Sequence, residues 1–410
     1  MAVVVLVGAL DTKGEEYALA ARLLREGGHT PLLIDVGVRD EPTVPPDIPR
    51  EQVCAAAGAT LAEVRAMPDR SASLTVMAGG LGHVLRDLHR SGRLDAALAM
   101  GGSGALTTAA PGFRTLPLGV PKVVVSTMAA SDMSAVIGAS DLVVLPAVVD
   151  ISGINRLTRF VIERAVAVTV AMLGVSIQTH RAGARVVALS MLGVTTDGVS
   201  AIRRRLSAAG YETIVFHANG AGGRSLETLA GSGWVDAVAD ITTAEIASQL
   251  VGGTAAAGPD RLRAAGSSGL PQVVSIGGCD LAIFGALDQV PERYRHRVLY
   301  QHGPHATLMR TSVQECRQIG AEIGAKLAAA RGPVRVILPT AGLSTLSVPG
   351  GPFHAPDADR ALRQALFDQL PADVPRVEVD GSVNDDTFAA TASMLIAELL
   401  DGRHDRRPGH

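Results

Sequence analysis

Residues 3–16 read VVVLVGALDTKGEE, and this stretch decides the fold class. The unbroken aliphatic run Val3–Val7 predicts a buried strand, and the loop that starts at Gly8 leads into helical spacing over Glu15–Arg25. A second aliphatic run, Pro31–Val36, follows. A buried strand, a helix and another buried strand in this order are typical of a parallel sheet with right-handed crossovers.

The same alternation continues along the chain. In the first half, further strands are expected at Leu74–Ala78, Ala96–Met100, Lys122–Ser126 and Leu142–Leu145, and then a long helix over about Leu157–Ser176. In the second half, strands are expected at Arg185–Ser190, Thr213–His217, Ala237–Asp240, Gln272–Ile276, Val334–Leu338 and Arg376–Val379. Helices are expected there at Ser200–Ala209, Ser312–Ala330, Asp357–Gln369 and Asp386–Leu400.

The two halves follow one plan. Val3–Val7 with its loop ending Asp11–Gly14 matches Val186–Ser190 with its loop ending Thr195–Gly198, and Met100–Ser103 also matches Ile276–Cys279. We therefore predict an α/β protein with two Rossmann-like domains, each a mainly parallel sheet flanked by helices, and a cleft between them. The predicted limits are 1–180 for a nucleotide-binding domain, 181–402 for a substrate domain and 403–410 for a tail.

The composition indicates which kinds of binding partner to expect. The chain has 410 residues, 47% of them hydrophobic, and its 37 basic and 40 acidic residues give a formal net charge of −3. Only 3% of the residues are aromatic, so little is available for stacking on bases, and nucleic acid is not expected as a main partner. A small-molecule substrate is expected instead.

The cysteines and the apolar segments indicate the compartment. Three scattered cysteines do not form a disulfide framework, and the start MAVVVLVGAL lacks a charged leader and a small-residue cleavage site. The most apolar stretch, Phe160–Val175, carries Glu163 and Arg164 and is too short to span a bilayer. We therefore predict a cytoplasmic protein without a membrane partner. The apolar character of Leu157–Val175 also predicts a domain or subunit interface, and a homo-oligomer is expected.

Glycine-rich loops follow two strands of the first half, and a Ser-Thr pair ends a third strand. Gly8–Glu16 opens a helix and contains Lys13, Gly101–Gly104 follows the next expected strand, and Ser126-Thr127 ends a third. Free N–H groups at helix starts bind anions, and ligands of open α/β sheets bind at the carboxyl ends of the strands. The alternative is turn chemistry alone, with Thr12 and Glu15 as a capping box. The order of glycine and lysine does not match a Walker A loop.

The second half contains the candidate acid and base residues. The loop His217–Glu227 combines a histidine, three glycines, an arginine and a carboxylate, and a loop over Tyr300–Thr311 places two histidines three residues apart. Histidine suits proton transfer near neutral pH, and arginine suits phosphate or carboxylate binding. A zinc site would need a third ligand that is not adjacent, and the loops could also serve only as turns. The candidate catalytic residues are His217, Arg224, Glu227, His302, His305 and Arg310.

Six motifs in order resemble a known family: Gly8–Glu16, Gly101–Gly104, Val149–Arg156, Gly193–Thr196, His217–Glu227 and His302–Thr311. Over about residues 1–400 the chain resembles the uncharacterised family of ATP-binding domains named after the tomato mosaic virus resistance protein. The resemblance implies two Rossmann-like domains, self-association, and ATP with Mg²⁺ in the first domain. The expected nucleotide contacts are Asp11, Thr12, Lys13, Gly101, Gly102, Ser103 and Gly104, with Thr127 at the same sheet edge.

Three functions remain open at this point. The first is an enzyme that uses ATP and Mg²⁺ to activate a small carboxylate, as a ligase or by phosphoryl or adenylyl transfer. The second is a non-catalytic, ATP-gated binding protein, and the third is a metal- or histidine-dependent hydrolase or lyase. An NAD oxidoreductase is disfavoured, because no Gly-x-Gly-x-x-Gly is followed by a ribose-binding acid at the usual distance.

Overall fold

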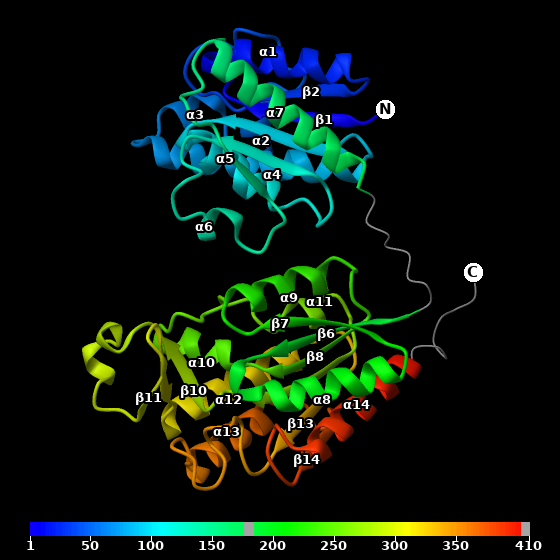
Figure 1. Ribbon diagram of the computed structural model, residues 1–410, viewed down its shortest axis with the longest axis vertical. Helices are drawn as coiled ribbons and strands as arrows, with labels where there is room; N and C mark the ends of the chain where they lie inside the picture. The colour runs from blue at the N-terminus through cyan, green and yellow to red at the C-terminus, as the bar shows by residue number, and fades with distance from the viewer. Residues whose placement is uncertain (176–183, 403–410) are drawn as a thin grey trace. The chain divides into compact units, whose positions relative to one another are not determined.

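A computed structural model describes residues 1–175 and 184–402 of the chain (Figure 1). The chain divides into two compact units, residues 1–178 and 179–410. Each unit has its own parallel sheet covered by helices, so the expected two-domain α/β fold is confirmed. No helix among the described residues is both long and apolar enough to cross a membrane.

The first domain is built on a five-stranded sheet in the order β2-β1-β3-β4-β5, and every neighbouring pair is parallel. Its first strand lies between the second and the third, so the chain winds first to one side and then to the other. The strands are β1 (Val3–Gly8), β2 (Thr30–Asp35), β3 (Ala96–Gly101), β4 (Lys122–Ser126) and β5 (Val143–Pro146).

Helices cover both faces of this sheet, because alternate residues of β1 point to opposite sides. Val5 and Val7 pack with α2–α5, while Val4 and Leu6 pack with α1 and α7. The helices are α1 (Leu10–Glu26), α2 (Arg50–Ala56), α3 (Leu61–Arg65), α4 (Arg70–Arg90), α5 (Ser103–Phe113), α6 (Ser134–Ile137) and α7 (Arg156–Leu173). A sheet buried on both faces explains why its strands are continuous aliphatic runs.

The second domain repeats this winding on a six-stranded parallel sheet, in the order β14-β13-β9-β8-β6-β7. Here β6 is the first strand and lies between the second, β7, and the third, β8. The strands are β6 (Val186–Met191), β7 (Glu212–His217), β8 (Ala237–Thr242), β9 (Gln272–Gly277), β13 (Val334–Pro339) and β14 (Arg376–Val379). The helices are α8 (Thr196–Ala208), α9 (Ala221–Gly231), α10 (Ala244–Val251), α11 (Ala264–Ser267), α12 (Val313–Ala328), α13 (Pro356–Gln369) and α14 (Asp386–Asp401).

A three-stranded antiparallel sheet in this domain was not expected from the sequence. It has the order β10-β12-β11 and consists of β10 (Leu281–Phe284), β11 (Leu299–Gly303) and β12 (Ala306–Arg310). The stretch Tyr300–Thr311, expected to be a loop, is therefore mostly a hairpin. Its two-residue turn is Pro304-His305, because Gly303 pairs with Ala306.

Two other expectations need correction. Leu74–Ala78 is not a strand but part of helix α4. Asp69 caps the N-terminus of this helix, because its carboxylate accepts the N–H of Ala72 at 2.7 Å. The expected match of Met100–Ser103 with Ile276–Cys279 is also wrong, because the two stretches follow strands at different places in their sheets. In sheet order β3 corresponds to β8, whereas the loop at Gly277 follows β9.

Candidate functional site

A cavity of about 420 Å³ lies at the carboxyl edge of the first domain's sheet. It lies above the ends of β1 and β3, where the winding of the sheet reverses, and this is where open α/β sheets bind their ligands. The lining residues are Val7, Gly8, Ala9, Thr12, Lys13, Val36, Arg70, Leu74, Met100, Gly101, Gly102, Ser103, Gly104, Ala105, Thr108, Ala109 and Asp150. The two glycine loops of the first domain thus meet at one cavity.

Tyr17 explains why β1 ends in a glycine. Its buried hydroxyl lies within hydrogen-bond distance of the carbonyl of Val7 and accepts the N–H of Met100 at 2.7 Å, so it joins the ends of β1 and β3. A Cβ atom on Gly8 would lie 2.1 Å from the Tyr17 ring. Burial raises the pKa of Tyr17, so the phenol stays neutral beneath the cavity.

The donors of the cavity come from a helix start and two cations. Helix α5 begins at Ser103, and the first N–H groups of a helix have no acceptor within it. Lys13 extends across the cavity edge and donates to the carbonyl of Ile151. The exposed guanidinium of Arg70 has no hydrogen-bond or ion-pair partner within residues 1–175 and 184–402. This combination favours an anionic ligand.

Most of the expected nucleotide contacts line this cavity, namely Thr12, Lys13, Gly101, Gly102, Ser103 and Gly104, but two do not. The carboxylate of Asp11 accepts the N–H of Arg39 at 3.1 Å and packs against Gly37. Thr127 instead holds the Gly101–Gly104 loop, because its N–H donates to the carbonyl of Gly101 at 3.3 Å. Arg70 and Tyr17 were missed in the sequence, since no local pattern around them indicates a ligand.

The loop after β5 closes one side of the cavity. Asp150 supplies the carboxylate among the lining residues, and the N–H of Gly153 donates to the buried carboxylate of Glu16 at 2.7 Å. Val148 has φ 65°, which is strained for a β-branched residue and is typical of functional loops. Asp150 is therefore the lining side chain that could hold a divalent cation.

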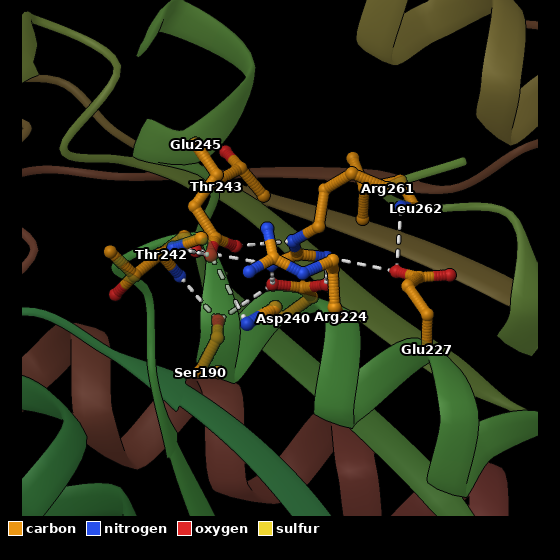
Figure 2. A network of polar contacts seen from close by, with 12 residues as sticks. Ser190, Arg224, Glu227, Asp240, Thr242, Thr243, Glu245, Arg261 and Leu262 are labelled. Carbon is orange, nitrogen blue, oxygen red and sulfur yellow. Dashed lines mark hydrogen bonds and ion pairs between the residues drawn. The ribbon is translucent and has the colours of Figure 1, made fainter. Parts of the chain in front are cut away.

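The second domain carries a buried ionic network around Arg261 (Figure 2). Its guanidinium binds Asp240 through two nitrogens, Glu245 at 2.5 Å and Glu227 at 3.2 Å. Asp240 also accepts the hydroxyl of Ser190 at 2.6 Å, which links β8 to β6. The Arg261 side chain is 1% exposed, so the network lies inside the domain.

Glu245 also binds the glycine loop after β7. Its carboxylate accepts the N–H of Gly220 at 2.6 Å and that of Gly223 at 3.1 Å, at the start of α9. A Cβ atom on Gly223 would lie 2.1 Å from this carboxylate. The glycines permit the close approach of the protein's own anion, so these N–H groups are not available to an external one.

Three of the other polar residues expected at this site, namely Glu227, Arg224 and Arg310, have internal partners. Glu227 accepts the N–H groups of Leu262, Arg263 and Ala264, and burial raises its pKa. Arg224 is exposed and donates to the carbonyl of Ala256 at 3.1 Å. Arg310, expected to bind an anionic substrate, instead pairs with Asp359 at 2.5 Å and donates to the carbonyls of Asp280, Phe353 and Ala355.

The three candidate histidines separate. His217 and His302 line one smaller cavity of the second domain, although 85 positions separate them in the sequence. His305 lies in the exposed turn between β11 and β12 and does not line it. Within the part of the chain that the structure describes, no group of three or more His, Cys, Asp or Glu residues could hold a metal ion.

Asp280 predicts a pH dependence of stability. It is fully buried, its Oδ2 accepts the Ser344 hydroxyl at 2.6 Å, and its Oδ1 has no hydrogen-bond partner among the described residues. Burial raises its pKa, although the Ser344 hydroxyl and the charge of Arg310 act in the opposite direction. The folded domain therefore holds this proton more tightly than the unfolded chain. The resulting stabilisation is complete below the ordinary aspartate pKa and is lost as the pH rises through the folded value.

Asp280→Asn should therefore gain stability relative to the unmodified protein as the pH rises from 4 to 8, by about 1 kcal/mol or more. Urea unfolding at several pH values measures this difference. The exposed Asp368→Asn is the control and should show no such trend. A constant difference between Asp280→Asn and the unmodified protein across this range would contradict the argument.

Comparison with known proteins covers both domains. The model of the N-terminal domain of an uncharacterised protein family (UPF0261) matches residues 2–178, and the model of its C-terminal domain matches residues 184–400. A UPF0261 protein of Rhizobium meliloti is 40% identical over 400 residues, which cover 97% of this chain and 98% of that protein. A UPF0261 protein of Clostridium tetani is 35% identical over 399 residues, which cover 97% of this chain and 99% of that protein.

The tomato protein behind the expected resemblance is also similar. The ToMV resistance protein Tm-1(GCR237) of Solanum lycopersicum is 36% identical over 312 residues, which cover 75% of this chain and 41% of that protein. The resemblance expected from the six motifs is therefore confirmed. Across both of its domains, the chain belongs to the uncharacterised protein family UPF0261.

Proposed function

We propose that the first domain binds ATP with Mg²⁺ in the cavity above β1 and β3. The observation that carries the proposal is the convergence of Lys13, Arg70 and the start of α5 on one cavity where the winding of the sheet reverses. Phosphates bind helix starts and cationic side chains, and Mg²⁺ would neutralise charge on the phosphate oxygens when bound. The apolar walls, with Val36, Leu74 and Ala109, suit a base or ribose.

The protein is then proposed to be a cytoplasmic enzyme that uses ATP to activate a small carboxylate, as a ligase or by phosphoryl or adenylyl transfer. Self-association is part of the proposal. Helix α7 buries Val161, Ile162 and Ala165 in its own domain, but Leu157 and Phe160 remain 56% and 55% exposed. A homo-oligomer would cover this apolar pair.

A non-catalytic, ATP-gated binding protein is the second candidate. It is favoured by the composition of the cavity, whose described lining contains no histidine and a single carboxylate, Asp150. The third candidate is a histidine-dependent hydrolase or lyase, and it is favoured by the position of His217 and His302 at one cavity. Release of ADP or AMP by the full chain in the presence of a carboxylate distinguishes the first candidate from the other two.

Isothermal calorimetry of the full chain with ATP and Mg²⁺ tests the binding step. We expect binding, and we expect Ser103→Ala to weaken it about fivefold to tenfold, because one hydrogen bond to a charged phosphate is lost. Ser91→Ala, at the far end of α4, is the matched control and should leave the affinity unchanged. Absence of heat at about 1 mM ATP, where a useful cofactor site would be largely filled, would overturn the proposal.

A further inference from the structure

The second domain has a separate cavity of about 240 Å³ that the ATP site does not involve. It lies between the carboxyl ends of β6 and β7 and the antiparallel sheet. The lining residues are Leu192, Gly193, Val194, His217, Asn219, Thr254, Ala255, Ile283, His302, Ala306 and Leu308. Every one of these belongs to the second domain, so the cavity is complete without the first.

The floor of the cavity is apolar. Leu192, Val194 and Leu308 belong to one buried cluster with Phe353, and Ile283 packs against it. An apolar cavity that opens to solvent gains most from an apolar occupant, because water there has few polar partners. The floor therefore fits an aliphatic or aromatic group.

Hydrogen-bond donors surround the mouth. His217 is the last residue of β7 and His302 lies on β11, and neither imidazole has a hydrogen-bond partner among residues 1–175 and 184–402. The Nε2 atom of His302 would lie 3.9 Å from a Cβ atom on Gly193. Asn219 uses its amide oxygen to accept the N–H of Gly222 at 3.2 Å, which leaves its NH₂ group as a donor.

The charges around the cavity restrict which polar group its ligand can carry. The described lining contains no lysine, arginine, aspartate or glutamate. A ligand amine would find no carboxylate partner. A phosphate would find no arginine, and the N–H groups of Gly220 and Gly223 are already bound by Glu245. A carboxylate needs fewer donors, and two imidazoles with an amide NH₂ group can supply them.

We propose that this cavity binds a small carboxylic acid with an apolar tail. The tail contacts Leu192, Val194 and Leu308, and the carboxylate accepts hydrogen bonds at the mouth from His217, His302 and Asn219. This inference names the substrate class for the proposed function and relies on that function for the reaction only. Binding of the acid does not require ATP.

The test titrates hexanoate into the full chain by calorimetry or ligand-observed NMR, with hexan-1-ol and hexylamine as probes that have the same number of carbon atoms. Hexanoate should bind, and hexylamine should bind at least tenfold more weakly. His302→Ala should weaken hexanoate binding about fivefold to tenfold and hexan-1-ol binding much less, because a donor to a charged group is lost. Ala306→Phe, which fills the cavity, should abolish binding of both.

His305→Ala is the matched control, since His305 lies three positions from His302 on the same hairpin and does not line the cavity. It should bind hexanoate normally. Equal binding of hexanoate and hexylamine, equal losses in His302→Ala and His305→Ala, or no hexanoate binding at about 10 mM would each overturn the inference. ATP titrated into the same samples gives an independent result, so failure here is distinguishable from failure of the nucleotide proposal.

Discussion

Replacement of Arg261 by methionine should lower the free energy of unfolding of the second domain by about 3–5 kcal/mol, because three carboxylates lose their shared cation. The side chains of Asp240 and Glu245 are 1% and 0% exposed, so water cannot replace the guanidinium. Methionine has a similar length but offers no donor. Two of the carboxylates also accept backbone N–H groups, and repulsion among the three would strain those hydrogen bonds as well.

The chain offers a convenient probe and a close control for this prediction. Its single tryptophan, Trp234, packs against a buried cluster of the second domain, so its fluorescence reports unfolding of that domain. Arg224→Met removes a neighbouring exposed arginine whose side chain makes one hydrogen bond among the described residues, to the carbonyl of Ala256. We expect this control to change stability by less than about 1 kcal/mol.

Further variants keep the prediction testable if Arg261→Met does not fold. Arg261→Lys retains the charge but loses the planar fork, and it should be intermediate in stability. Addition of Glu227→Gln to Arg261→Met should recover part of the loss, because one of the unpaired charges is removed. Equal unfolding midpoints for Arg261→Met and Arg224→Met would show that the network does not stabilise the domain.

The network also shows where sequence reasoning stops. Glycines, a histidine, an arginine and a carboxylate at His217–Glu227 indicated a ligand-binding loop. The partner of that loop is Glu245, which lies in the first turn of α10, 25 positions from Gly220, and only the folded domain brings the two together. A glycine-rich loop at a helix start predicts that an anion binds there. It does not predict whether that anion is a ligand or the protein's own carboxylate.

Local patterns predicted most of the first-domain site, because its loops directly follow aliphatic strands whose carboxyl ends share one edge. The roles of Arg70 and Tyr17 were not predicted, since the position of each side chain depends on how a helix packs on the sheet. The antiparallel sheet was not predicted for another reason. Its strands β10, β11 and β12 have only 4, 5 and 5 residues, too short for a clear period-2 signal. That sheet forms one wall of the second cavity.

The nucleotide proposal predicts the largest loss of affinity for a double variant, Lys13→Ala with Arg70→Ala. Each cation should contribute a charge-assisted contact to a phosphate, and their joint loss should weaken ATP binding about 100-fold, or roughly 2.7 kcal/mol. Arg70 should supply much of this, because its guanidinium has no partner within the described residues to release. Lys13 would exchange its bond to the Ile151 carbonyl for a phosphate oxygen.

A charge-matched control separates this local effect from a change in net charge. Arg22→Ala with Arg25→Ala removes two positive charges from exposed positions of α1 that do not line the cavity, and it should leave ATP affinity within about twofold of the original. Calorimetry with ATP, ADP and AMP then locates the cations along the ligand. If Lys13 and Arg70 hold the terminal phosphates, the loss in the double variant falls from ATP through ADP to AMP. Equal losses for all three nucleotides would place the cations at the base or ribose, and unchanged ATP affinity would remove the observation on which the nucleotide proposal rests.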